Sequence, residues 1–207
     1  MRYRDIGFGV FLLFLVSILP GCVMKEPLSN PDEAKLDDRL LGPWKFVDEK
    51  VKGHPPILHI GKADIRRAPP GIMKGVWLEN DEKNQVQVST YYFFPTCLGQ
   101  AHYSNILDVN PLDGEKPKTW NENRVEDWLL TKYAVENDRL TIWLLAAKAA
   151  EEAVQKGEVK GIIEEKGLLK FKRTLLTDSK DLCHFLLNGG DKKLFSDEHK
   201  MVFSRIK

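Results

Sequence analysis

Several features typical of catalytic and metal-binding sites are missing from this chain. It has only three cysteines and five histidines among 207 residues, and none of them stands in a C-x-x-C, H-x-H or H-E-x-x-H spacing. A zinc site needs three or four such ligands within tetrahedral reach. The Gly-x-Ser-x-Gly turn of many hydrolases and the glycine-rich loop that cradles phosphate are also missing. The sequence therefore predicts no metal, no cofactor and no enzymatic activity.

An excess of charge of one sign is missing as well. Lys and Arg together number 31 and Asp and Glu together number 30, and the two signs are interspersed along the chain. Nucleic-acid binding proteins usually show a basic run or a basic face. We therefore expect no nucleic-acid partner.

The N-terminal apolar run is too short to be a membrane anchor. It covers residues 6–20 and includes two glycines and a proline. Spanning the hydrocarbon core takes about 20 apolar residues. A basic start at Arg2 and Arg4, a short apolar run and a small residue at Gly21 are typical of a secretory signal peptide, which we predict for residues 1–21.

The end of this signal, Leu19-Pro20-Gly21-Cys22, resembles the lipobox of bacterial lipoproteins. The resemblance implies cleavage after Gly21 and attachment of a diacylglycerol to Cys22, with a further acyl chain such as palmitate on the new amino terminus. Two or three acyl chains hold a protein on a bilayer much better than one. Val23, where an Asp would imply retention in the inner membrane, implies an outer-membrane lipoprotein that faces the periplasm.

The remaining chain divides into a tether and one domain. Residues 22–35 begin with the lipidated cysteine and are mostly polar, which predicts a flexible tether. Residues 36–207 are long enough to bury a core without disulfides and form a single β-rich domain. The two cysteines in it, Cys97 and Cys183, favour either a disulfide in an oxidising compartment or two small buried side chains.

The domain is rich in strand patterns. Alternating apolar residues predict strands over residues 72–79 and 85–94, the second ended by Pro95, with a partner over residues 102–109. Further hairpins are predicted over 125–144, turning at residues 136–139, and over 158–175, with a last strand over 201–206. Two late helices are predicted over 146–156 and from Asp178 to the Asn-Gly-Gly at 188–190.

Sequential hairpins with two late helices favour an antiparallel sheet that curls into a barrel or half-barrel, since closure removes exposed strand edges. A sheet-and-helix α+β sandwich is the alternative. The fold class is therefore mainly β, of the α+β type.

Residues 36–47, LDDRLLGPWKFV, resemble the opening of lipocalin-like β-barrels. In these proteins a short helical turn closes the barrel base and a Gly-x-Trp motif, here Gly42 and Trp44, enters the first strand. The resemblance also implies that Arg205 on the last strand lies over Trp44. The alternative interpretation of Trp44 is a core residue in an ordinary strand.

The lipocalin-like resemblance implies a cavity for a small apolar ligand. The aromatic residues that could line it are Trp77, Tyr92, Phe94, Tyr133 and Trp143. The role predicted for the protein is to bind such a ligand, or a partner in the envelope. The alternative is a structural or interaction lipoprotein whose barrel is filled by its own side chains.

Overall fold

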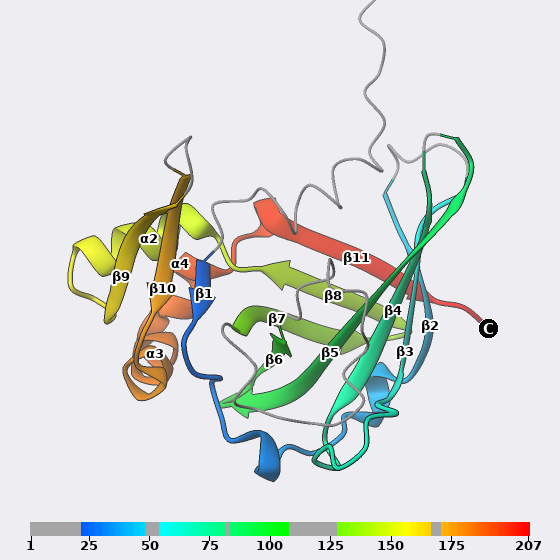
Figure 1. The fold of residues 1–207 in the computed structure, drawn as a ribbon, viewed down its shortest axis with the longest axis horizontal. Coiled ribbons are helices and arrows are strands. Elements are labelled where there is room, and N and C mark those ends of the chain that lie inside the picture. Colours follow the sequence, from blue (N-terminus) through cyan, green and yellow to red (C-terminus); the bar gives the residue numbers. More distant parts are fainter. Residues whose placement is uncertain (1–21, 49–53, 82, 108–127, 167–170) are drawn as a thin grey trace, which may run out of the picture.

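The computed structural model of the protein describes residues 22–48, 54–81, 83–107, 128–166 and 171–207. Eight of its strands form an antiparallel barrel (Figure 1). These strands are β2 (Gly42–Phe46), β3 (Ile57–Lys62), β4 (Met73–Asn80), β5 (Val86–Leu98), β6 (Ala101–Leu107), β7 (Trp128–Glu136), β8 (Arg139–Leu144) and β11 (Lys200–Arg205).

The barrel is closed by the pairing of β6 with β7. The strand order runs β6-β5-β4-β3-β2-β11-β8-β7, and β6 then pairs with β7. In that last pairing His102 lies opposite Tyr133 and Leu107 lies opposite Trp128. The predicted antiparallel barrel is therefore confirmed.

Side chains alternate between the two faces of the barrel wall, as the pleat of a strand requires. In β4 the inward positions from Met73 to Glu79 are buried, and the outward positions between them are half-buried. The buried inward side chains form an inner core, which consists of Leu40, Trp44, Ile60, Met73, Trp77, Phe93, Tyr133, Leu140 and Phe203.

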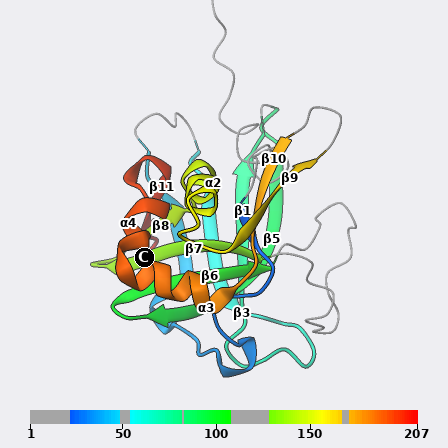
Figure 2. The same ribbon diagram turned by 90° about the vertical axis from the view of Figure 1, so that its left-hand side faces the viewer.

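A second layer covers one side of the barrel wall (Figures 1 and 2). It contains three added strands that extend the sheet beyond β7 in the order β1-β10-β9, together with the helices. Its elements are β1 (Cys22–Met24), α2 (Ala147–Gln155), β9 (Gly161–Lys166), β10 (Phe171–Leu176), α3 (Ser179–Phe185), η5 (Leu186–Gly190) and α4 (Asp191–Leu194).

A separate outer core lies between this layer and the barrel. It joins outward side chains of the barrel wall, such as Phe94 and Trp128, to buried residues of the helices, such as Ala150 and Leu182. Phe94 and Trp128 meet edge to face with ring centroids 5.5 Å apart. The wall between the cores is thus covered by apolar groups on both faces.

The late helices follow the prediction except at their end. The Asp178 side chain caps α3 by accepting a hydrogen bond from the Asp181 amide at 3.0 Å. The chain was expected to leave the helix at residues 188–190, but it only kinks there, with Gly189 at a φ of +96°. It then continues as α4, which buries Leu194 completely.

The predicted flexible tether differs from the structure. Residues 22–24 form β1, which pairs in parallel with β10 and antiparallel with β7. Met24 and Leu28 are buried, and the Leu28 amide donates to Oδ1 of the buried Asn105 at 2.7 Å. The few apolar residues in this polar stretch are buried where β1 pairs with β7 and β10, so the segment packs against the barrel.

The predicted end of a strand at Pro95 is also wrong. β5 continues through Pro95 to Leu98 and stays paired with β6 over this length. Pairing of β4 with β5 ends at Met73 and Phe93. Beyond that point β5 lies at an edge on its β4 side, where a residue without an N–H group is tolerated.

Candidate functional site

One end of the barrel is closed by the short helix η2 (Asp38–Leu40). Trp44 below it is fully buried, and its Nε1 donates to the Leu40 carbonyl at 2.7 Å. The Arg205 guanidinium lies 4.1 Å from the centre of the Trp44 ring, as the lipocalin-like resemblance implied. Its Nη1 and Nη2 donate to the carbonyls of Leu41 and Arg39, each at 2.6 Å.

Gly42 makes this approach of Arg205 feasible. Its φ of +112° is one that residues with a side chain rarely adopt. A Cβ at this position would stand 3.3 Å from Nη1 of Arg205. The residues Gly42, Trp44 and Arg205 therefore act as one unit that seals the η2 end.

The opposite end of the barrel interior is more accessible. Nearer to η2, inward side chains such as Trp44, Met73 and Leu140 have no exposed surface. Although Trp77 at the other end is buried, several apolar inward side chains there are only partly buried. They are Phe46, Leu58, Tyr91, Ile106, Ile142 and Met201.

A small polar cluster lies within this accessible half, on neighbouring inward positions of β4 and β5. Trp77 stands opposite Ser89, and Glu79 follows two positions along the same face of β4. Burial raises the pKa of the Tyr91 phenol, the Ser89 hydroxyl bonded to it lowers that pKa, and the charge of Glu79 raises it further. The inner face of this half thus carries apolar side chains and a few neighbouring polar groups, a combination that also occurs in small-molecule sites.

The indole nitrogen of Trp77 has no hydrogen-bond partner. Trp77 is 6% exposed, and its Nε1 is the one fully buried side-chain nitrogen or oxygen in the described residues that lacks a partner. Buried polar groups are nearly always paired. Periodicity alone gives no signal for such an atom, so sequence reasoning missed it.

The five aromatic residues predicted to line a pocket do not come together. Trp77 and Tyr133 lie in the inner core, whereas Tyr92 and Phe94 belong to the outer core and Trp143 packs against it. The Trp143 Nε1 donates to Asp197 outside the barrel at 2.9 Å. The prediction failed because it did not fix which face of each strand turns inward.

Tyr133 lies on the η2 side of the interior. Its hydroxyl donates to Oδ2 of Asp37 at 2.9 Å, and its ring stacks on His102 with centroids 5.5 Å apart. Burial, followed by the Asp37 charge, raises the pKa of Tyr133 far above its usual value. This tyrosine is therefore a structural donor at the barrel base.

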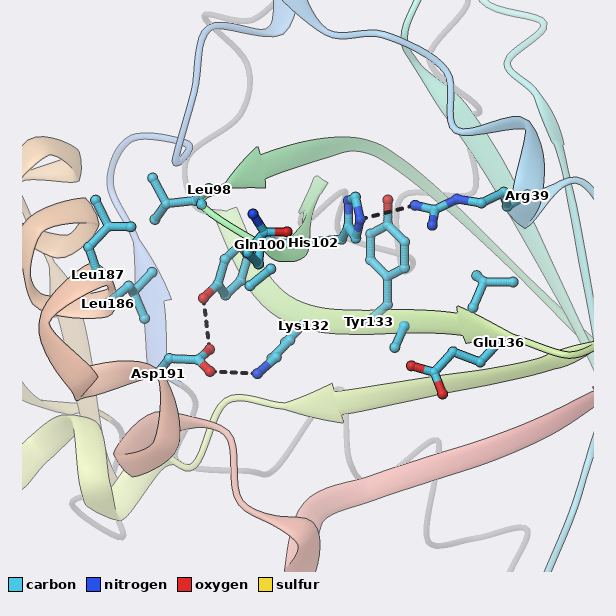
Figure 3. A pocket seen from close by; sticks show the side chains of 15 residues that line it. Arg39, Leu98, Gln100, His102, Lys132, Tyr133, Glu136, Leu186, Leu187 and Asp191 are labelled. Atoms are coloured by element: carbon cyan, nitrogen blue, oxygen red, sulfur yellow. Dashed lines mark hydrogen bonds and ion pairs between the residues drawn. The ribbon is translucent and has the colours of Figure 1, made fainter.

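A groove with a volume of about 590 Å³ lies outside this end of the barrel, between β6, β7 and the helical layer (Figure 3). At one end of it Arg39 binds the Asp37 carboxylate through Nε at 2.8 Å and Nη2 at 2.7 Å. Arg39 Nη2 also lies 3.1 Å from Nε2 of His102. Because arginine only donates, a hydrogen bond between these two nitrogens uses His102 Nε2 as the acceptor.

The other end of the groove holds a second set of paired groups. The Asp191 carboxylate accepts from the Tyr103 hydroxyl at 2.7 Å and forms an ion pair with Lys132 (Figure 3). These contacts join β6 and β7 to α4. Because Arg39, Lys132 and Asp191 all have partners of opposite charge, we interpret the groove as a clamp between barrel and helices.

For Cys97 and Cys183 the sequence left two alternatives open, a disulfide or two small buried side chains. Cys97 and Cys183 are both free. Cys97 Sγ contacts the Gly99 carbonyl, whereas Cys183 Sγ contacts the Leu28 carbonyl, each at 3.6 Å. The two thiols contact different elements and form no disulfide, and Cys97 is exposed and so does not fit the buried alternative either.

Cys22 lies in β1 and is 7% exposed. Burial raises the pKa of its thiol to about 12, although the nearby Arg173 works in the opposite direction. The predicted signal peptide, residues 1–21, lies outside the described residues.

The described part of the chain contains neither a metal-binding cluster nor a helix that could span a membrane. Its His, Cys, Asp and Glu side chains form no group of three or more that could hold a metal ion. None of its helices has the length and apolar character that a membrane span requires.

Comparison with known proteins returned no matching family model, no matching curated protein and no matching solved structure.

Proposed function

We propose that this protein binds a small, mainly apolar ligand inside its barrel, which the ligand enters at the end opposite η2. The observation that carries the proposal is the graded burial of the interior. Trp44, Met73 and Leu140 near η2 have no exposed surface, whereas Phe46, Tyr91 and Ile142 toward the other end remain partly exposed. Near η2 partial exposure is confined to the rim, at residues such as Val135.

The energetics favour a ligand over water in this half of the barrel. Its walls are aliphatic and aromatic, and each Å² of apolar surface removed from water contributes about 25 cal/mol. When a ligand covers these side chains, apolar surface of both the ligand and the protein is removed from water, and both areas contribute to the binding free energy. A barrel filled by its own side chains leaves no space for such a ligand.

We also propose that the chain is a lipoprotein anchored through Cys22 to the periplasmic face of the outer membrane. This proposal rests on residues 1–22. Acyl chains cannot be attached to a sulfur that stays buried in β1, so the lipidated form requires β1 to leave the sheet. The Cys22→Ala variant should no longer pellet with membranes, and a pellet as large as that of the wild type would contradict the anchor.

Ligand binding can be tested by thermal unfolding of the chain lacking residues 1–21, with and without hexylbenzene as an apolar probe. A ligand present at 100 times its Kd stabilises the folded protein by about 2.7 kcal/mol. We expect hexylbenzene to raise the Tm.

The matched variants place a tryptophan inside or outside the barrel. Ile142→Trp narrows the interior and should abolish the Tm shift, whereas Ile162→Trp, at a position 53% exposed on β9, should leave it unchanged. If hexylbenzene shifts neither the wild type nor the control, the interior is filled. The protein is then better described as a structural or interaction lipoprotein.

A further inference from the structure

We infer that Trp77 and Glu79 together bind a hydroxyl group of the ligand, so that the ligand class is an apolar alcohol or phenol. This inference rests on the proposed function, since it concerns the same half of the barrel interior. It adds to the apolar body of the ligand a specific polar group, which the apolar walls alone do not select.

The first part of the argument is the unmet donor. The Trp77 Nε1–H is buried and has no acceptor. The ring makes edge-to-face contacts with Phe203 at 6.0 Å and with Phe46 at 6.4 Å between centroids, which hold it in place. An aromatic face is a much weaker acceptor than an oxygen lone pair. An oxygen that accepts from Nε1 would therefore stabilise this part of the interior.

The second part is a buried carboxylate on the same face. Glu79 is 9% exposed and follows Trp77 by two strand positions, so their Cα atoms are about 7 Å apart. Among the described residues no Lys, Arg or His forms an ion pair with Glu79. A carboxylate accepts hydrogen bonds and does not donate them. Its oxygens are not among the fully buried, unpartnered atoms of the described residues, so a donor on a ligand can replace water as their partner.

One chemical group meets both requirements. A hydroxyl oxygen accepts from Trp77 Nε1 and donates its proton to Glu79, whereas an ether only accepts and an ammonium only donates. A ligand carboxylate would face the like charge of Glu79, which disfavours fatty acids. The partly exposed aliphatic and aromatic walls fit the remaining apolar body of an alcohol or phenol.

Three probes with one apolar body separate these contributions. Hexylbenzene has no polar group, 4-hexylanisole accepts, and 4-hexylphenol both accepts and donates. Their Kd values are measured by titration calorimetry on the chain lacking residues 1–21. We expect 4-hexylanisole to bind about fivefold more tightly than hexylbenzene, as one neutral hydrogen bond allows. We expect 4-hexylphenol to bind at least a further tenfold more tightly, because its bond to Glu79 is charge-assisted.

Two variants assign the effects to residues. Trp77→Phe keeps a ring but removes the N–H, and should bring the ratio of anisole to benzene affinity to about one. Glu79→Gln keeps the size but removes the charge, and should lower the ratio of phenol to anisole affinity severalfold. The controls Trp143→Phe and Glu136→Gln change residues outside the inner core and should alter neither ratio. Ratios are used because they cancel any general loosening of the barrel.

The outcomes distinguish this inference from the proposed function. If none of the probes binds the folded protein, the proposed function fails and the inference fails with it. If all three bind with equal affinity, the interior is a purely apolar site, and only the inference is overturned. Ratios that persist in both Trp77→Phe and Glu79→Gln would also overturn it, because the hydroxyl would then be bound elsewhere.

Discussion

Arg205 and Trp44 lie opposite each other in adjacent strands, and the guanidinium stacks 4.1 Å from the indole centre while donating to two carbonyls of the η2 turn. Arg205 thereby links the last strand to the helical turn that closes the barrel. Arg205→Ala should lower the free energy of unfolding by about 2 kcal/mol, since it removes two hydrogen bonds from a charged donor and a cation–π contact. Denaturant unfolding measures this, with the exposed Arg139→Ala as control. Equal losses in the two variants would contradict the role of Arg205.

Trp44 is the largest fully buried side chain among the described residues. Its side chain has no exposed surface, so truncation leaves a large cavity. Trp44→Ala should cost about 3–5 kcal/mol of unfolding free energy, as large-to-small changes at buried aromatic residues do. A loss below about 1 kcal/mol in denaturant unfolding would show that Trp44 does not support the barrel base.

The Asp37 carboxylate should make the barrel base sensitive to acid. Burial works to raise its pKa, but hydrogen bonds from Arg39 and Tyr133 outweigh burial and hold the pKa below its usual value. The stabilisation is therefore present above about pH 4, the ordinary Asp pKa, and is lost as the pH falls through the lowered value. The Tm of the wild type should fall more steeply between pH 4 and 2 than that of Asp37→Asn.

Asparagine is suitable for this comparison because it can still cap η2 as Asp37 does. The exposed Asp38→Asn serves as the control and should keep the steep acid response of the wild type. Parallel Tm curves for the wild type and Asp37→Asn would contradict the assignment.

Asp191 should hold the helical layer on the barrel. Asp191→Ala leaves the half-buried Lys132 and the buried Tyr103 hydroxyl without their partner, which should cost about 1–3 kcal/mol. Amide hydrogen exchange should accelerate in α4 and η5 more than in β4. Lys192→Ala, at the next position along α4, is the control. Uniform exchange rates across all these elements would show that the groove is not a clamp.

The three thiols should react in a fixed order in the unlipidated protein. Cys97 is exposed, whereas Cys22 is buried with a pKa of about 12 and therefore carries little thiolate. Iodoacetamide labelling followed by mass spectrometry should modify Cys97 first and Cys22 last. After denaturation without a reductant all three should react. Protection of Cys97 and Cys183 under those conditions would indicate a disulfide.

Local patterns in the sequence were sufficient to predict the barrel. Hairpin turns such as the one at Asn137 and Asp138 have positive φ values and join strands where alternation predicted them. The arrangement of Gly42, Trp44 and Arg205 follows from a short motif in β2 and its pairing with the last strand, β11. Each of these features depends only on residues close in sequence or on the pairing of a single pair of strands.

Features that depend on several pairings at once could not be predicted. Tyr92 and Trp77 belong to adjacent strands, and only the register decides that one points outward and the other inward. The packing of residues 22–28 depends on an edge created by β7 and β10, which lie far along the chain. The unpartnered Trp77 nitrogen likewise results from the assembled interior.

The measurement that tests ligand binding most directly is native mass spectrometry of the Cys22→Ala variant, purified gently from a periplasm. We predict an additional mass that disappears on denaturation and is missing from the same protein carrying Ile142→Trp. A mass equal to that of the chain alone, together with no Tm shift from hexylbenzene, would contradict a ligand-binding barrel.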